Sequence, residues 1–555
     1  MGAVLVLVVR RWPAAVRLLW LLSALAALAL ALPVWPAADV RIPWVPGTPD
    51  VALPLSLHVD ALTVTLAGSV GLIAVATALG DLSASAPWRF VIGRQLAFGI
   101  ALVVVAAADV AIAASAVLLL PLAAGLSRRF DDDARLSAIG GLFAAGLSLL
   151  AAAGFGVGSL PGFLALAAAI LFVLFQLPFT SLGESVLTGL PGAFATNLAT
   201  IVLPGMAIVI RFGVEGGEPW RLQLLSAVGA STMAFAGVVA ARNRSLPSLL
   251  AAVTSLQAGA CLVALGQGIS PTQPAAILIG TSAVLALAAL SLTADRLATV
   301  LGTNTIDGLV GVGRAAPITT MLLLAAALAL SPLPLVGGAA IGGAVSLAGA
   351  ISDGRIAIVL VALLGLGGAA AGLGRMAVLP FLPNPDRPSL REQPLALLAA
   401  AAPLLAAVIA GALAFTAWDP AARAAIAAFG TRPRPTGGEL IALPWIGVVG
   451  ALLLLVLTSA AGIFVGVRRG RTQRLPIRRA EPGQALVPAD EAEFADWMDE
   501  NERLLLDTRP VLGWLGGIGR FVLWAFAQGL AVLEGRYYMA TVLVLGLWAL
   551  IVFLG

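Results

Sequence analysis

The sequence predicts an all-α polytopic membrane protein with about fifteen membrane-spanning helices. The first observation is composition: 60% of the 555 residues are hydrophobic and 11% are charged, whereas soluble domains have about 45–50% and about 25%. The second is that apolar runs that reach or approach the length of a membrane span recur from residues 17–35 to residues 540–554. These runs are rich in Ala and Leu and do not alternate as strands do, so helices are indicated and a barrel is not.

The expected spans follow from these runs, with boundaries good to a few residues. Each is a stretch of mostly apolar residues bounded by charged, Gly-rich or Pro-rich positions. The predicted spans are residues 15–35, 57–80, 95–109, 111–126, 136–155, 160–178, 190–212, 222–241, 246–268, 273–294, 315–350, 356–374, 394–416, 441–467 and 537–555.

The span at 315–350 is interrupted by the segment Ser-Pro-Leu-Pro-Leu-Val-Gly-Gly at 331–338. An α-helix cannot continue through it without losing backbone hydrogen bonds. The segment is therefore either a tight turn between two short helices or the break in one transmembrane helix. A single broken span keeps the six arginines of 468–479 on the same side as the other arginine-rich loops, so we prefer the broken helix.

The net charge of +4 comes mostly from arginines in short loops between spans. Such arginines set membrane topology, so nucleic-acid binding is not indicated. Their distribution places the N-terminus in the cytoplasm, and we expect the chain to lie in the cytoplasmic (inner) membrane of a prokaryote. The first apolar run, after Arg10 and Arg11, also resembles a signal peptide, but no small-residue cleavage site stands out and we expect a retained span.

Three regions are expected along the chain. Residues 1–467 form the transmembrane domain, and residues 468–510 form a polar cytoplasmic linker that includes nine carboxylates between 481 and 507. Residues 511–555 form a helix lying along the membrane surface at 511–533, followed by the last span. The competing interpretation makes 511–533 a sixteenth span, which would move the C-terminus to the other side.

The chain has too few cysteines and histidines for the sites that these residues usually build. Cys261 and His58 are the single residues of their types, so neither a disulfide framework nor a thiolate or histidine metal site is expected. No Ser/His/Asp, metal-ligand or phosphate-loop constellation stands out. We expect no cofactor and no catalytic centre in the chain itself, although it could be a non-catalytic subunit of an enzyme complex.

Two adjacent segments resemble the central signature of the antiporter-like subunits of respiratory complex I, membrane-bound hydrogenases and Mrp-type antiporters. The first is Gln-Leu-Pro-Phe-Thr-Ser-Leu-Gly-Glu at 176–184, and the second is Pro-Gly-Ala-Phe-Ala-Thr-Asn-Leu-Ala-Thr-Ile-Val-Leu-Pro-Gly at 191–205, ending in Arg211 and Phe212. Weaker matches follow the family order at 44–47, 59–62, 250–259 and 313–337. The resemblance covers residues 40–376.

This resemblance implies a fold with broken helices, in a chain that looks like a member lacking its first helix. It also implies a place in a membrane arm beside other membrane subunits, possible peripheral redox subunits, and a C-terminal brace like the lateral helix of the longer members. The parent assembly could be a quinone-reducing respiratory complex, a membrane-bound hydrogenase, an Mrp-like antiporter or a related inorganic-carbon uptake system.

The proton-relay residues of the family are missing. The chain has no lysine, and arginine does not release a proton in proteins. The positions that would carry the relay Glu, Lys and His are occupied by Leu118, Val173, Asn197, Leu203, Thr281, Leu285 and Ile341 with the neighbouring Gly342.

Three functions remain open from the sequence. The first is a proton-silent subunit that fills a structural position in a membrane arm. The second is a stand-alone transporter whose broken helices form the substrate site. The third is proton or cation translocation along a reduced polar path through Asp60, Asp109, Gln176, Glu184, Asn197, Thr200, Thr254 and Gln257.

Overall fold

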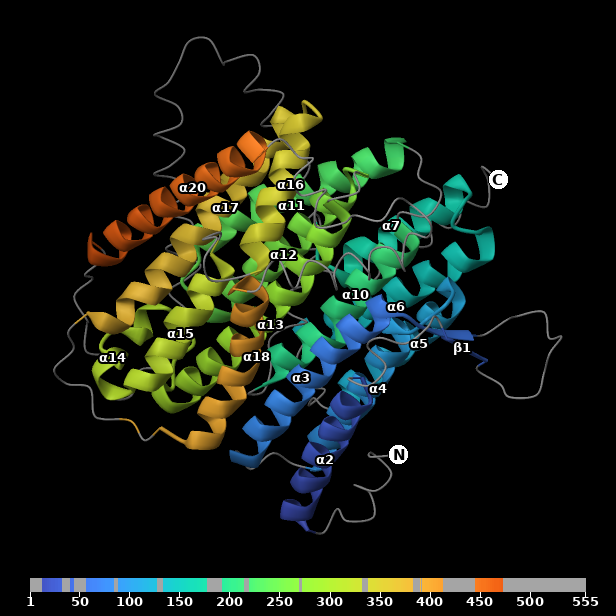
Figure 1. The fold of residues 1–555 in the computed structure, drawn as a ribbon. Helices are drawn as coiled ribbons and strands as arrows, with labels where there is room; N and C mark the ends of the chain where they lie inside the picture. Colours follow the sequence, from blue (N-terminus) through green and yellow to red (C-terminus); the bar gives the residue numbers. More distant parts are fainter. Residues whose placement is uncertain are drawn as a thin grey trace. The chain divides into compact units, whose positions relative to one another are not determined.

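The computed structural model describes residues 12–31, 40–43, 56–83, 88–126, 133–176, 192–213, 219–268, 272–331, 338–382, 390, 392–412 and 445–472. By its internal contacts the chain divides into two units, residues 1–471 with 547–555 and residues 472–546. The described residues up to 471 belong to the first unit and form a bundle of apolar helices (Figure 1).

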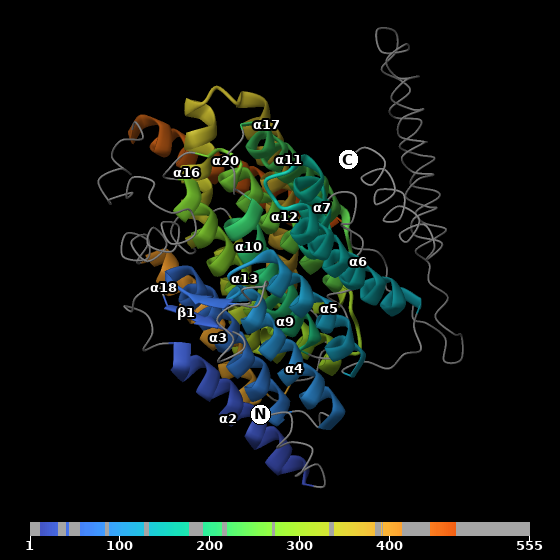
Figure 2. The same cartoon turned by 90° about the vertical axis from the view of Figure 1, so that its right-hand side faces the viewer.

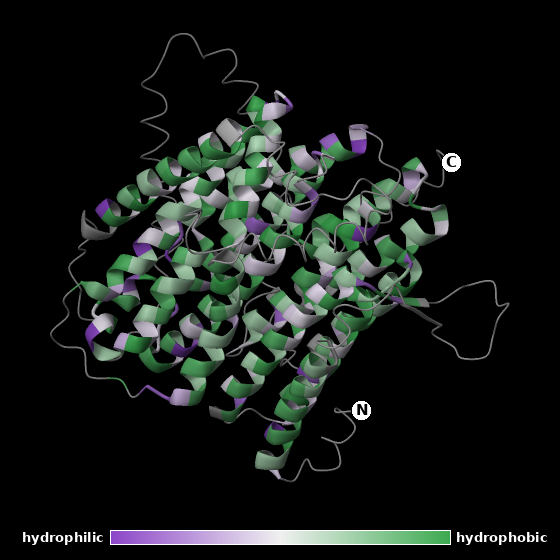
Figure 3. Cartoon of the chain, viewed as in Figure 1, coloured by the Kyte–Doolittle hydropathy of each residue, from purple (hydrophilic) through white to green (hydrophobic). Residues whose placement is uncertain are grey.

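Every predicted span that the structure describes contains an apolar helix, although several helix ends differ from the predicted bounds. Seven described helices are long and apolar enough to cross a membrane, and the other apolar helices are shorter. Hydrophobic residues run along most helices, with hydrophilic residues mostly near their ends (Figure 3). The chain is therefore a multi-pass membrane protein. The predicted last span at 537–555, the surface helix at 511–533 and residues 473–510 of the linker lie outside the described residues.

One expectation was wrong at the start of the second span. Residues 57–59 were predicted to be helical, but they belong to β2 (Ser56–Val59), which pairs antiparallel with β1 (Val40–Pro43). The helix α3 begins only at Ala61 because Asp60 caps it, accepting a hydrogen bond from the Thr63 amide at 2.7 Å. A capping carboxylate satisfies one of the free N–H groups at a helix start.

The interrupted span is a broken helix made of α15 (Pro317–Leu330) and α16 (Gly338–Ser352), as preferred from the sequence. Both halves pack along the 30-residue helix α13 (Thr272–Leu301) and scarcely contact each other. Figure 1 shows α16 higher in the view than α15, and Figure 2 shows α16 beside α13. Gly338 lies against Ser282 of α13, and Gly349 lies against Thr272, so α16 runs antiparallel to α13.

A second irregular span runs from Ala193 to Gly213. Two π-helical turns, η1 (Leu198–Val202) and η2 (Val209–Gly213), interrupt its α-helical parts. Pro204 accounts for the first, because it has no N–H to donate to the carbonyl of Thr200 one turn earlier. Single π-helical turns inside α-helices are frequent at functional sites.

Close glycine contacts hold α17 (Ile356–Val378) between two helices. On one side a Cβ at Gly237 of α11 would lie 2.1 Å from the carbonyl oxygen of Gly365. On the other side a Cβ at Gly466 of α20 would lie 2.1 Å from the carbonyl oxygen of Ala371. The glycine-rich stretch at 364–374 therefore serves helix packing, as small residues commonly do between membrane helices.

The remaining elements of the first half are apolar helices joined by short connections, several with proline in the first turn. They are α2 (Pro13–Ala31), α4 (Trp88–Val105), α5 (Val110–Leu126), α6 (Asp133–Phe155), α7 (Leu160–Val173), α9 (Ala193–Asn197) and α10 (Leu203–Ile208).

The second half has the same character, with two single-turn 3-10 helices. Its remaining elements are α11 (Pro219–Arg242), α12 (Leu246–Leu265), η3 (Asp307–Leu309), α14 (Val312–Ala315), η4 (Leu379–Phe381), α18 (Pro394–Ala412) and α20 (Trp445–Thr472).

Candidate functional site

Gln176 lies where α7 ends. The span was predicted to continue to 178, but the helix stops at Val173 and Phe175 adopts a positive φ of 53°. The fully buried Gln176 side chain donates from Nε2 to the carbonyl of Leu174 at 2.8 Å and to that of Ser255 in α12 at 3.4 Å. The carboxamide therefore joins the end of α7 to α12.

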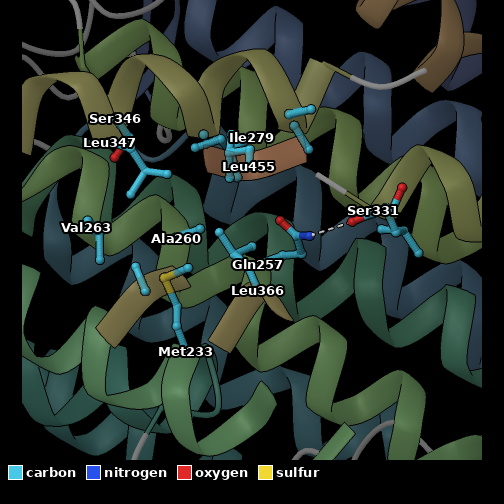
Figure 4. A pocket seen from close by; sticks show the side chains of 15 residues that line it. Met233, Gln257, Ala260, Val263, Ile279, Ser331, Ser346, Leu347, Leu366 and Leu455 are labelled. Atoms are coloured by element: carbon cyan, nitrogen blue, oxygen red, sulfur yellow. Dashed lines mark hydrogen bonds between the residues drawn. The ribbon is translucent and has the colours of Figure 1, made fainter. Parts of the chain in front are cut away.

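Gln257, a residue of α12, makes a corresponding hydrogen bond to the broken helix. Its Nε2 donates to the carbonyl of Leu330, the last residue of α15, at 3.3 Å. The side chain is 5% exposed and lines a cavity of about 30 Å³ together with Ser331 and Ser346 (Figure 4). Through these two glutamines α12 is hydrogen-bonded to the end of α7 and to the end of α15. Membrane proteins need such bonds where backbone groups lose their helical partners.

Asp60 belongs to a charged cluster at the start of α3. Arg211, in η2, donates from Nη2 to Asp60 Oδ1 at 2.8 Å and to Thr63 Oγ1 at 2.6 Å. Arg211 Nη1 lies 3.2 Å from Nδ1 of His58, which is also 3.7 Å from Asp60 Oδ2. The cluster therefore joins the paired strands β1 and β2 to the irregular span 193–213, because His58 belongs to β2 and Arg211 lies in the last turn of the span.

The other described residues of the predicted polar path belong to different elements. Asp109 caps α5, accepting from the Ile112 amide at 3.0 Å, and Thr254 donates to the carbonyl of Leu250 in its own helix at 2.8 Å. Asn197 is partly exposed where α9 meets η1, and Thr200 is buried within η1. Glu184 lies outside the described residues.

The positions at which the resemblance would place relay residues hold packed or self-bonded side chains. Val173 and Leu203 are almost fully buried, and Val173 lies so close to Gly205 that a Cβ there would meet it at 2.5 Å. Leu118 packs in the same way on Gly146 of α6. Thr281 donates to the carbonyl of Ile277 within its own helix.

The remaining two positions lie on or against α13. Leu285 is 6% exposed within it. Ile341 is half-buried at the start of α16, and its neighbour Gly342 lies against Ala275 and Ile279.

Sequence reasoning missed a second charged cluster. Arg94 of α4 pairs with Asp81 near the end of α3, and both side chains are buried. Across from this pair the Gly192 amide donates to Asp295 Oδ2 of α13 at 2.9 Å, and Gly192 lies against the Arg94 guanidinium. No spacing pattern in the sequence links these positions, which are 13 and about 200 residues apart, so only the fold brings them together.

Within the described residues this arrangement offers hydrogen bonding and ion pairing, with no group of three or more His, Cys, Asp or Glu side chains that could hold a metal. The two charged clusters lie near helix ends. The other buried polar side chains of the described residues are carboxamides and hydroxyls, together with the guanidinium groups of Arg221 and Arg375, and the rest of the interior is apolar.

Comparison with solved structures identifies the fold. The chain is similar to a chain of the Mrp complex from Dietzia sp. DQ12-45-1b, with 19% identity and a TM-score of 0.69 over 97% of this chain and 63% of that one. It is similar to a chain of respiratory complex I from Thermus thermophilus with bound NADH, with 19% identity and a TM-score of 0.65 over 78% and 100%.

A third similarity is to a chain of the membrane-bound sulfane sulfur reductase, an archaeal respiratory membrane complex, with 15% identity and a TM-score of 0.65 over 80% and 97%. No protein-family model matches the sequence, and no curated protein matches it. The chain spans less than two thirds of the Mrp chain's length. At these identities the comparisons establish the antiporter-like fold that the sequence motifs predicted.

Proposed function

We propose that this chain is a structural, proton-silent subunit of a multi-subunit membrane complex. The observation that carries the proposal is the filling of the expected relay positions by packed side chains, above all Val173 against Gly205 and Leu118 against Gly146. Proton transfer through hydrocarbon needs titratable groups at intervals along the path. Leucine and valine at these positions provide none.

The fold supports membership in such a complex. Its structural neighbours are chains of an Mrp complex, a respiratory complex I and a sulfane sulfur reductase complex. We propose that the partners of this chain are likewise membrane subunits of a complex, with peripheral redox subunits if the parent is a respiratory or hydrogenase-type assembly. The proposed location is the cytoplasmic (inner) membrane with the N-terminus inside.

The role we assign to the interior is mechanical. The pairs Gln176 with Ser255 and Gln257 with Leu330 fix the two helix ends to α12, and the glycine contacts of α17 hold its neighbours. A bundle held in this way presents an unchanging surface to the subunits on either side.

The first test is extraction of the tagged protein from its own membranes in a mild detergent, followed by mass spectrometry of the proteins that co-purify. Recovery of sister antiporter-like chains or redox subunits in fixed proportion would support the proposal and identify the complex. Recovery of the chain alone in a monodisperse state would favour a stand-alone transporter.

The second test measures proton flux. The chain reconstituted in liposomes with an internal pH dye is expected to pass protons no faster than empty liposomes. Flux above that level that is lost both in Gln257→Leu and in Asp109→Asn would contradict proton silence and favour the reduced polar path. In a complementary experiment, Leu118→Glu, Val173→Lys, Asn197→His and Leu285→Lys are installed together, and any flux gained would show that these positions are where conduction was lost.

A further inference from the structure

His58 lies at the junction between β2 and the end of the irregular span 193–213, and its main chain is held on both sides. Its amide donates to the carbonyl of Ala106, between α4 and α5, at 2.7 Å. Its carbonyl accepts from Thr63 Oγ1 at 2.7 Å. Because these bonds fix the backbone, the imidazole ring is the part of His58 that can respond to a change of charge.

The contact between the ring and Arg211 defines the protonation state of His58 in this arrangement. Nδ1 of the ring lies 3.2 Å from Arg211 Nη1. A guanidinium has donors and no acceptor, so this contact is a hydrogen bond only when Nδ1 has a lone pair and the ring proton is on Nε2. In this state His58 is neutral and accepts from Arg211.

The second neighbour of Nδ1 is a carboxylate oxygen. Asp60 Oδ2 lies 3.7 Å from Nδ1, which is too long for a hydrogen bond. This oxygen is buried and accepts no hydrogen bond among the described residues, whereas Oδ1 accepts from the Thr63 amide and from Arg211. A buried acceptor without a donor is unfavourable, so Oδ2 is available to a proton on Nδ1.

Protonation changes the contacts that the ring can make. An imidazolium has an N–H on both nitrogens, so Nδ1 no longer accepts from Arg211, and two positively charged groups then lie 3.2 Å apart. Rotation of the ring toward Asp60 Oδ2 replaces this repulsion with a charge-assisted hydrogen bond.

The neighbouring charges leave Asp60 as the acceptor for the protonated ring. The charged residues on the described elements around His58 are Asp60, Arg211, Arg41 opposite His58 in β1, and Asp109, just beyond the bridge between Leu57 and Ala107. Asp109 accepts from the Ile112 amide as the cap of α5. Asp60 is therefore the carboxylate that contacts His58.

We propose that His58 is a proton-binding site that controls how firmly strands β1 and β2 are linked to the span 193–213. In the neutral state His58 accepts from Arg211. In the protonated state it donates to Asp60 Oδ2 and loses the bond to Arg211, while the bonds of Arg211 to Asp60 Oδ1 and Thr63 remain.

The exposure of the three side chains supports this assignment. His58 keeps 15% of its side chain exposed, against 3% for Asp60 and 7% for Arg211, so solvent protons reach the imidazole first. Histidine is also the side chain whose charge ordinarily changes between about pH 5 and pH 8. The inference goes beyond the proposed function, because one proton-binding side chain at the start of a span is not a path across the membrane.

The test uses the fact that His58 is the one histidine in the sequence. In the full chain in detergent, isotopically labelled histidine gives one set of ring nitrogen signals by NMR, and their chemical shifts distinguish a protonated nitrogen from one with a lone pair. At about pH 8 we expect the ratio of the Nε2–H form to the Nδ1–H form to be at least about fivefold above that of free histidine, because Arg211 donates to Nδ1.

Arg211→Leu should lower this ratio, and Asp109→Asn, the matched change at a helix cap, should leave it unchanged. A wild-type ratio equal to that of free histidine in the same detergent would overturn the proposal, and this comparison needs no variant. A ratio that stays high in Arg211→Leu would also overturn it.

The second measurement follows the protonated ring at about pH 5. The Nδ1–H proton should exchange with water at least about tenfold more slowly in the wild-type chain than in Asp60→Asn. Asparagine keeps the helix cap and has no second oxygen to accept from Nδ1. Asp60→Ser, which also caps and also lacks that oxygen, serves if the asparagine variant does not fold. Equal exchange in the wild-type chain and the variant would overturn the transfer to Asp60, and a ring that stays neutral at about pH 5 would overturn the proton-binding site itself.

Discussion

The ends and the middles of the helices are held together by different chemistry. At the ends, two buried arginines join separate helices through carboxylates: Arg211 binds Asp60, and Arg94 binds Asp81. In the middles, the contacts are glycine packing, apolar filling and the hydrogen bonds of two glutamines, Gln176 to the carbonyl of Ser255 in α12 and Gln257 of α12 to the carbonyl of Leu330. The difference teaches that, among the described residues, buried ion pairs join elements near helix ends, whereas uncharged side chains make these contacts in the middles.

The comparison has an energetic side. A buried ion pair is weak evidence of stability, but removal of one partner leaves an uncompensated charge and is strongly destabilising. Packing contacts depend on the fit between surfaces, so added atoms at a close contact lower the free energy of unfolding. Charged ends and packed middles should therefore respond to substitution by different amounts, and the predictions below test that difference by measuring the free energy of unfolding in mixed micelles. Reaction of the buried Cys261 with a thiol-reactive dye reports unfolding.

The largest effect is expected from Arg94→Gln. The substitution leaves Asp81 and Asp295 without the guanidinium that lies between them, and the expected loss of stability is about 3–5 kcal/mol. Arg355→Gln is the control, because Arg355 pairs with Asp353 where both side chains are partly exposed, at 24% and 32%. Such a pair contributes about 0–1 kcal/mol. Equal losses in the two variants would contradict the structural importance of the buried cluster.

The next effect is expected from Gly237→Ala in the packed middle. The added methyl would lie 2.1 Å from the Gly365 carbonyl oxygen, and overpacking of this kind costs about 1–3 kcal/mol. Gly99→Ala in α4 is the matched control, because a Cβ there meets nothing within 4 Å. It should raise stability by about 0.5–1 kcal/mol through the better helix propensity of alanine. If both variants behave alike, α11 and α17 are not in close contact.

A smaller effect is expected from Asp60→Asn, which separates the capping of α3 by Asp60 from its ion pair with Arg211. Asparagine caps a helix as well as aspartate does, so Asp60→Asn keeps the cap on α3 and removes only the charge that faces Arg211. The expected loss is about 1–3 kcal/mol. Asp109→Asn should change stability little, because Asp109 caps α5 and makes no ion pair among the described residues. A loss of the same size at both positions would assign the effect to capping alone.

Features of the helix ends and middles could be predicted from the sequence where the signal is local, that is, where it comes from residues close together in the chain. Apolar runs and the prolines and glycines at 331–338 are local, so the spans and the broken helix were predictable. Asp60 and Asp109 fall near the ends of the predicted spans 57–80 and 95–109, and each caps a helix in the structure. The β-hairpin was missed because β2 is only four residues long and continues directly into an apolar helix.

The non-local contacts could not be predicted in the same way. The approach of Asp295 to Arg94 depends on how α13 lies against α4 and α9, and the partners of Gln257 and Ser346 depend on how the broken helix meets α12. Such contacts are set by packing, which leaves no periodic signal in a single sequence. The motif resemblance indicated the fold, whereas the loss of relay residues stays a prediction, and the resemblance could not indicate which side chains pack at those positions.

The smallest effect tests whether the hydroxyls of the middle belong to a path or to their own helices. Thr281, at an expected relay position, donates to the carbonyl of Ile277 at 2.8 Å, so Thr281→Val removes a bond within one turn and keeps the shape of the side chain. Polar contacts between membrane helices average about 0.6 kcal/mol, and an intrahelical bond whose carbonyl already serves the helix should contribute less. We therefore expect unchanged stability within about 0.5 kcal/mol and unchanged proton flux in liposomes. A clear change in proton flux at constant stability would mean that a hydroxyl in the middle of α13 contacts mobile water. The proposed contrast between charged helix ends and middles that do not carry protons would then be wrong at Thr281.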